Sequence, residues 1–128
     1  MQPKTLRSCV LIEPFICNEN DSIVDVAKKL REISLRHIFV VNNETYPIGI
    51  ISMTDINNRV VAENKNLHDT KAKDMMSKPI DVFDINDDIQ SSCEKMIEKN
   101  HVMNAVIENK KIKGIITIHQ LIKKCEEK

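Results

Sequence analysis

The sequence predicts an α/β protein made of two similar units in tandem, and three stretches that match when the chain is aligned with itself carry this prediction. When Asn20 is set against Asn86, "NDSIVDVAKKLRE" matches "NDDIQSSCEKMIE". In the same alignment, "FVVNN" from Phe39 matches "AVIEN" from Ala105. After a one-residue deletion, "GIISMTDI" matches "GIITIHQL", and these strings begin with the only two glycines, Gly49 and Gly114. A repeat of about sixty residues therefore occurs twice.

The first copy has the pattern helix, strand, strand, helix. Ser22 followed by Asp25 is typical of a capping box at a helix start. The residues after it place apolar side chains on one helical face: Ile23, Val26, Ala27, Leu30 and Ile33. Two β-branched runs, "HIFVV" and "IGIIS", flank the turn-rich "NNETYP" and predict paired strands. Thr54 is expected to cap a second helix whose buried face is Ile56, Val60 and Val61.

The second copy repeats this order. Its first helix is expected to bury Ile89, Cys93, Met96 and Ile97, and its last helix Leu121, Ile122 and Cys125. The strands between them are "NAVIE" and "KGIIT", and a short extended segment, like "PFI" in the first copy, precedes each unit. A three-stranded sheet with helices on one face buries too little at this length, so we expect the two copies to pair. The expected boundaries are residues 1–62 and 74–128, joined by a polar surface linker at 63–73.

Composition excludes several functions. Nineteen basic residues balance nineteen acidic ones, and only four residues are aromatic, which argues against a nucleic-acid partner. No stretch approaches the roughly twenty apolar residues of a membrane span, and the amino terminus lacks a secretory apolar core, so we expect a cytoplasmic protein. The four cysteines show neither a metal-binding nor a redox spacing, and no metal is expected. Two glycines are too few for a phosphate loop, and no catalytic motif is present, so we expect no enzyme activity.

The repeat resembles a known regulatory module. "KAKDMMSKPIDVFDINDDI" is similar to the opening of a CBS domain, and "VVN" or "VIE" followed by "GIIS" or "GIIT" is similar to its middle. The whole chain therefore resembles a stand-alone tandem CBS pair, or Bateman module. The resemblance implies two β-α-β-β-α units packed sheet to sheet, with two composite clefts between them. It also implies binding of adenosyl compounds, a homodimer in the form of a disk, and regulation of a separate effector protein.

The preferred ligand site is the segment after the first glycine. The resemblance assigns the sugar and phosphate of an adenosyl ligand to Ile50, Ser52, Thr54 and Asp55. The chemistry agrees, because a carboxylate can accept both hydrogens of a ribose diol and hydroxyls suit a phosphate. The alternative is that Thr54 and Asp55 only cap a helix.

The resemblance completes this cleft with base-binding residues from the second copy. By position these are Ile80, Asp81, His101, Val102 and Met103. Apolar Ile80 and Met103 could hold a flat purine between them. The alternatives are that Met103 fills the core and that His101 is only a helix-end residue.

The second predicted cleft combines a sugar-binding segment that lacks the aspartate with a pair of basic residues. Its expected residues are Phe15, Ile16, Leu35, Arg36, His37, Thr117, His119 and Gln120. Arg36 and His37 suit phosphates, since an arginine fork binds them bidentately. Gln120, however, replaces the ribose aspartate and lacks its charge.

These features predict one adenosyl ligand per chain, in the Asp55 cleft. Because no arginine matches Arg36 there and Asp81 lies nearby, we expect a ligand of low negative charge: S-adenosylmethionine, methylthioadenosine or AMP rather than ATP. Arg36 would serve this site if phosphates reached across the central region. The alternative function is a constitutive dimerisation and protein-interaction module with empty clefts, which a ligand screen would distinguish.

Overall fold

The structure, a computed structural model, describes residues 4–33 and 36–126. Leu35 and the side chain of Ile33, both named above, lie outside the described part. The chain divides into two compact units. We call Phe15–Ile80 the first-repeat unit, and Met1–Pro14 together with Asp81–Lys128 the second-repeat unit.

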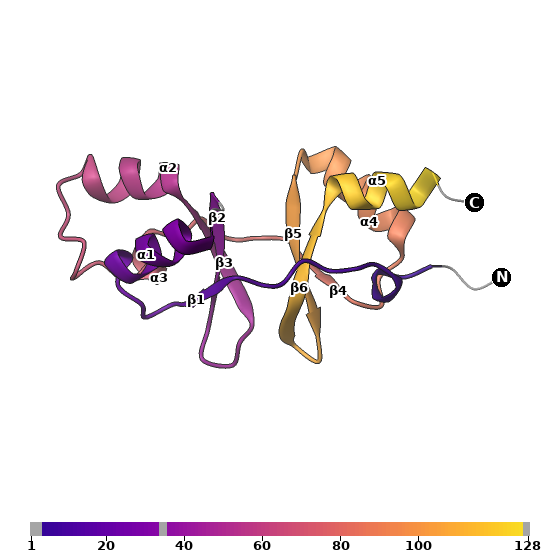
Figure 1. Cartoon of the computed structure of the whole chain (residues 1–128), viewed down its shortest axis with the longest axis horizontal. Helices are drawn as coiled ribbons and strands as arrows, with labels where there is room; N and C mark the ends of the chain where they lie inside the picture. The colour runs from indigo at the N-terminus through magenta and orange to yellow at the C-terminus, as the bar shows by residue number, and fades with distance from the viewer. Residues whose placement is uncertain (1–3, 34–35, 127–128) are drawn as a thin grey trace. The chain divides into compact units, whose positions relative to one another are not determined.

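The first-repeat unit is a three-stranded sheet covered by helices. Its elements are β1 (Ile16–Asn18), α1 (Ile23–Ile33), β2 (His37–Val41), β3 (Pro47–Ser52), α2 (Met53–Ile56), the π-helical turn η2 (Asn57–Val61) and α3 (Ala72–Met75). The order is β1-β2-β3, with β1 parallel and β3 antiparallel to β2. All three α-helices lie on one face of the sheet (Figure 1), where the side chains of α1 and β2 form a buried core.

The second-repeat unit has the same plan. Its elements are η1 (Leu6–Ser8), β4 (Val82–Asp84), α4 (Ile89–Lys99), β5 (Met103–Glu108), β6 (Lys111–Thr117) and α5 (Ile118–Glu126). The order is β4-β5-β6, again with one parallel and one antiparallel pair. Helices α4 and α5 share one face of this sheet (Figure 1). Leu6, from the amino-terminal segment, is fully buried in its core.

The repeat extends to individual hydrogen bonds. After β1, the Asn18 N–H donates to Asp21 Oδ2 at 2.9 Å, and after β4 the Asp84 N–H donates to Asp87 Oδ2 at 2.9 Å. The two pairs occupy matching positions in the alignment that sets Asn20 against Asn86. The prediction of a mixed α/β fold from two similar units is confirmed.

Each sheet also receives a segment that precedes the other repeat in the sequence. Ile12, which precedes β1, pairs with Ile115 of β6. The N–H of each residue donates to the carbonyl of the other at 2.9 Å. Likewise Ser77, which precedes β4, pairs with Ile50 of β3 through bonds of 2.9 and 3.1 Å. Residues 63–73, expected as a linker, are tied to the first-repeat unit as well, since the Lys73 N–H donates to Glu19 O at 3.0 Å. The repeat boundaries drawn from the sequence stay a prediction.

These added segments explain both glycines. A Cβ on Gly49 would lie within 2.8 Å of Met76 Cγ, and one on Gly114 within 2.6 Å of Leu11 Cβ and 3.0 Å of Ile12 O. Each glycine therefore lets an added segment approach its sheet closely. One such position per repeat accounts for the chain's two glycines.

Several expected core residues are exposed instead: Val61 (55%), Ile97 (56%), Ile122 (39%) and Cys125. The first three directly follow fully buried residues, namely Val60, Met96 and Leu121. Successive helical side chains point about 100° apart, so the second of two adjacent apolar residues leaves the buried stripe. Cys125 lies in the last turn of α5, where its thiol still hydrogen-bonds Cys93.

None of the helices in residues 4–33 and 36–126 has the length and apolar character that a bilayer crossing requires.

Candidate functional site

The β3–α2 junction is built around a reciprocal cap. The Asp55 N–H donates to Ser52 Oγ at 3.0 Å, and the Ser52 N–H donates to Asp55 Oδ2 at 3.0 Å. Ser52 is therefore the N-cap, and the helix begins at Met53. The prediction that Thr54 caps this helix is wrong, because the hydroxyl three residues before the carboxylate is that of Ser52. Thr54 is an exposed first-turn residue.

The Asp55 carboxylate also faces a cation that the sequence reasoning missed. Its Oδ1 lies 3.9 Å from Arg59 Nε, and the Asp55 side chain is 21% exposed. Arg59 Nη1 donates to the Met75 carbonyl at 2.9 Å. The (i, i+4) spacing of Asp55 and Arg59 could have suggested this pair from the sequence, whereas the long-range bond to Met75 could not. A carboxylate offers about four lone-pair sites, so the cap and the ion pair leave it able to accept further hydrogens.

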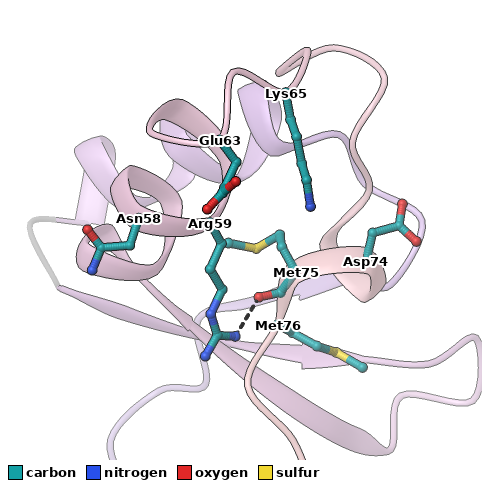
Figure 2. Close-up of a pocket in the computed structure, with 7 residues that line it drawn as sticks. All are labelled: Asn58, Arg59, Glu63, Lys65, Asp74, Met75 and Met76. Carbon is teal, nitrogen blue, oxygen red and sulfur yellow. Dashed lines mark hydrogen bonds between the residues drawn. The ribbon is translucent and has the colours of Figure 1, made fainter.

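A pocket opens beside this arginine. It has a volume of about 310 Å³ and is lined by Asn58, Arg59, Glu63, Lys65, Asp74, Met75 and Met76. Figure 2 shows the Arg59 side chain extending to the main chain of Met75, with charged side chains of both signs around it. Arg59 thus connects the helix that begins at Met53 to the segment that leads out of the unit.

The basic pair assigned to the second cleft lies at the same edge of this sheet. The Met53 N–H donates to Arg36 O at 3.1 Å, and His37 pairs with Ser52 across β2 and β3. Arg36 and His37 are exposed, and the Arg36 guanidinium has no hydrogen bond or ion pair within residues 4–33 and 36–126. The structure therefore brings the backbone of Arg36 next to the Ser52–Asp55 junction. Phe15 and Ile16 are half-buried at the start of this unit.

The β6–α5 junction has the same cap with different chemistry. The Thr117 N–H donates to Gln120 Oε1 at 3.0 Å, and the Gln120 N–H donates to Thr117 Oγ1 at 3.3 Å. The Gln120 side-chain amide then donates from Nε2 to the Val10 carbonyl at 2.6 Å. His119 is exposed on the first turn. Gln120 therefore replaces the carboxylate as a cap and adds a donor that a carboxylate lacks.

The residues predicted to contact the base of the ligand are divided between the two units. Ile80 ends the first-repeat unit, half-buried, whereas Asp81, His101, Val102 and Met103 belong to the second-repeat unit. Lys99 Nζ contacts both Asp81 carboxylate oxygens at 2.9 and 3.0 Å, and His101 Nδ1 lies 3.6 Å from Asp81 Oδ2. Val102 is 61% exposed, and Met103 is half-buried at the start of β5. Asp81 is thus already paired with a lysine that the sequence reasoning did not name.

Among residues 4–33 and 36–126, no three His, Cys, Asp or Glu side chains come together in a way that could hold a metal ion. The groups around the Ser52–Asp55 junction are hydroxyls, one paired carboxylate and an exposed arginine. These groups suit a polar organic ligand with hydroxyl or phosphate groups.

Two relatives share most of this chain. An uncharacterised protein of Methanopyrus kandleri, MK0525, is 29% identical over 103 residues, which are 80% of this chain and 53% of that protein. A homoserine O-acetyltransferase of Methanococcus vannielii is 28% identical in an alignment 110 residues long, which covers 78% of this chain and 22% of the enzyme. The chain therefore spans about half of the first relative and less of the second.

Solved structures have the same fold. Staphylococcus aureus OpuCA matches with a TM-score of 0.75 and 21% identity, over 90% of this chain and 94% of that one. PAE2072 of Pyrobaculum aerophilum, a CBS domain protein complexed with AMP, matches with a TM-score of 0.73 and 22% identity, over 91% of this chain and 89% of that one. A hexameric CBS-CP12 protein from bloom-forming cyanobacteria matches with a TM-score of 0.72 and 19% identity, over 98% of this chain and 74% of that one.

Comparison with family models identifies the two repeats directly. The CBS domain matches twice, over residues 8–62 and 72–127, which together make up most of the chain. These matches include both strand-to-helix junctions and both glycines that precede them. The chain belongs to the CBS-domain family and carries two copies of the domain.

Proposed function

We propose that this chain is a regulatory module, not a catalyst, that binds an adenosyl compound and signals to a separate protein. The observation that carries the proposal is the Ser52–Asp55 junction, where a carboxylate and hydroxyls lie beside the backbone of Arg36. A carboxylate accepts both hydrogens of a ribose diol, and an exposed guanidinium can pair with a phosphate. The AMP complex of PAE2072 supports this ligand class.

The position of Arg36 favours one member of the expected ligand set. Among AMP, S-adenosylmethionine and methylthioadenosine, only AMP carries a phosphate that an arginine can bind bidentately. We therefore propose AMP as the first ligand to test, with ATP as the more highly charged comparison. Ile50 and Thr54 are proposed as further sugar or phosphate contacts. The base contacts stay as predicted from the sequence: Ile80, Asp81, His101, Val102 and Met103.

The Gln120 junction supports one ligand per chain. Its side-chain amide already donates to Val10 O and accepts from the Thr117 N–H, which leaves it less able to bind a ribose diol. We propose that the second predicted site, with Phe15, Ile16, Leu35, His37, Thr117, His119 and Gln120, stays empty.

A ligand screen tests the proposal. Unfolding temperatures measured with AMP, S-adenosylmethionine, methylthioadenosine and ATP should rise for at least one, since a ligand at a hundred times its Kd stabilises by about 2.7 kcal/mol. Asp55→Asn, which keeps an acceptor for the cap, should weaken that binding about tenfold in calorimetry because the charge is lost.

Asp88→Ala is the matched control. Asp88 caps α4 by accepting the Ser91 N–H at 2.8 Å, and it lies outside the proposed site. Its loss should lower the free energy of unfolding by about 1 kcal/mol and leave the AMP affinity unchanged. No thermal shift with any of the four compounds would contradict the proposal.

The second candidate function is a constitutive dimerisation and protein-interaction module. Exposed Ile97 on α4 and Ile122 on α5 favour it, because apolar side chains on neighbouring helices suit a protein partner. We propose a homodimer under either function, with a separate effector protein. Native mass spectrometry should show a dimer that the double substitution Ile97→Glu/Ile122→Glu converts to monomer, and a wild-type monomer would contradict it.

A further inference from the structure

The second-repeat unit contains three of the four cysteines. They are Cys9, Cys93 and Cys125, whereas the first-repeat unit contains only Cys17. Cys93 lies within α4 and is 5% exposed, and Cys125 lies in the last turn of α5 with an exposed side chain. Cys93 and Cys125 are not among the residues of the proposed ligand site, so any chemistry they have is separate from it.

The Cys93 and Cys125 thiols contact each other. Helices α4 and α5 pack side by side on one face of the second sheet (Figure 1). A hydrogen bond joins the two thiols across this contact, and Cys93 belongs to the buried core of the unit. The packing of two helices, and not a loop, therefore holds the sulfur atoms near each other.

The internal repeat supports this placement independently. In the alignment that sets Asn20 against Asn86, Cys93 corresponds to Ala27, and in the alignment of the two glycines Cys125 corresponds to Val60. Val60 is fully buried in the core of the first-repeat unit, and Ala27 packs against the same core. The two helical positions thus face one core in the first repeat as well. Only the second repeat has a sulfur atom at both positions.

We propose that Cys93 and Cys125 form a redox modification site, which a hydroperoxide converts to a disulfide between α4 and α5. Cys125 reacts first because its side chain is exposed. Its thiolate displaces hydroxide from hydrogen peroxide and becomes a sulfenic acid. The Cys93 sulfur then attacks the Cys125 sulfur, losing its proton as the S–S bond forms, and the sulfenic hydroxyl leaves as water. In total, two thiols and one hydrogen peroxide give one disulfide and two waters.

The disulfide would fasten the end of α5 to α4. Because Cys125 lies in a terminal turn, it can adjust to disulfide geometry more easily than a residue inside a helix. The bond would close a long loop that contains β5 and β6, and such a bond stabilises a fold by restricting its unfolded chain. The first-repeat unit has one cysteine and gains no internal bond. Oxidation should therefore stabilise the second-repeat unit.

Peroxide treatment of the reduced, folded chain tests this assignment. Remaining thiols are then blocked in denaturant, and non-reduced peptides are analysed by mass spectrometry. Cys93 should be joined to Cys125, while Cys17 should still be blocked as a free thiol. A dithiol reductant should reverse the change. The oxidised protein should unfold at a temperature about 5 °C or more above that of the reduced protein.

Cys93→Ala removes one partner, since alanine is the native residue at the matching position 27. In this variant peroxide should leave Cys125 as a sulfenic acid that dimedone traps, and it should produce neither an internal disulfide nor a thermal shift. Cys9→Ser is the matched control, because it removes a cysteine of the same unit that the proposal does not use. It should form the Cys93–Cys125 bond as the wild type does.

Several results would overturn the proposal. They are a wild type in which the bond forms only in urea or not at all, a bond that joins Cys9 to either residue, and a Cys125–Cys125 bond between two chains. An unfolding temperature that stays the same or falls on oxidation would show that the bond does not fit the fold. None of these results depends on AMP binding, so the proposed function is tested separately.

Discussion

The two strand-to-helix junctions, Ser52–Asp55 and Thr117–Gln120, have the same capping geometry and different chemistry. At the first, a carboxylate accepts the cap N–H, and a separate residue, Arg59, holds the Met75 carbonyl. At the second, Gln120 does both tasks, accepting from Thr117 and donating to Val10. Val10 and Met75 occupy corresponding positions in the two repeats, because the same number of residues separates them as separates Asp55 from Gln120. The loss of the aspartate is therefore also the gain of a neutral link to the amino-terminal segment.

The difference separates two kinds of site. The first junction keeps a negative charge on a carboxylate that is partly exposed, which a ligand diol can engage. At the second junction, the Gln120 carbonyl oxygen and one amide hydrogen are already bonded within the protein. Substitutions at matched positions can test whether this contrast is real.

The largest expected effect is at the glycines. Gly114→Ala should lower the free energy of unfolding by roughly 3 kcal/mol, the upper end of what overpacking costs. Its new methyl would meet the Ile12 main chain and Leu11 Cβ, whereas that of Gly49→Ala would meet only the Met76 side chain, which can move. Gly49→Ala should therefore cost only about 1 kcal/mol. Urea unfolding of both variants measures the difference, and a larger effect at Gly49 would show that the two added segments are not held as described.

The next effect is at Gln120. Gln120→Glu keeps the cap acceptor but loses the donor to Val10 and places a carboxylate oxygen against its carbonyl. It should therefore destabilise the fold by about 1 kcal/mol or more. Hydrogen exchange should quicken at the Ile12 amide, which bonds Ile115. Asp55→Asn, the matched change, should leave that amide unaffected, and equal protection of Ile12 in Gln120→Glu and wild type would contradict the link.

The strands and helix starts of the repeats could be predicted because they depend on short, local sequence patterns. The runs "HIFVV" and "GIIS" predicted β2 and β3, and Ser22 predicted the start of α1, where the Asp25 N–H donates to Ser22 Oγ at 3.3 Å. Sequence reasoning missed the contacts that join distant segments, such as Gln120 with Val10. It also placed the cap of the second helix at Thr54, two residues after the Ser52 cap that the structure has.

The smallest effect concerns the buried thiols, which report on each unit separately. Burial, with a smaller contribution from Asp21, raises the pKa of the Cys17 thiol to about 12 from its ordinary 9.0. Burial, with a hydrogen bond to Cys125, raises the pKa of the Cys93 thiol to about 11. The neutral thiols therefore stabilise the fold below about pH 9, and this stabilisation is lost as pH rises towards 11 and 12.

Alkylation followed by mass spectrometry measures this difference. At pH 8 exposed Cys125 should react first, while Cys17 and Cys93 should react only when their units open. Gln120→Glu should speed labelling of Cys93, in the second-repeat unit, and leave Cys17 unchanged. Faster labelling of Cys17 alone would place the weakened contact in the first-repeat unit and contradict the prediction.

The proposed function requires that the first junction binds a ligand and that the second does not. Isothermal titration of AMP into folded wild-type protein should give one site per chain. Asp55→Ala should weaken this binding about tenfold or more, and Gln120→Ala should leave both the affinity and the stoichiometry unchanged. Two sites per chain, or a loss of affinity with Gln120→Ala and not with Asp55→Ala, would contradict the account.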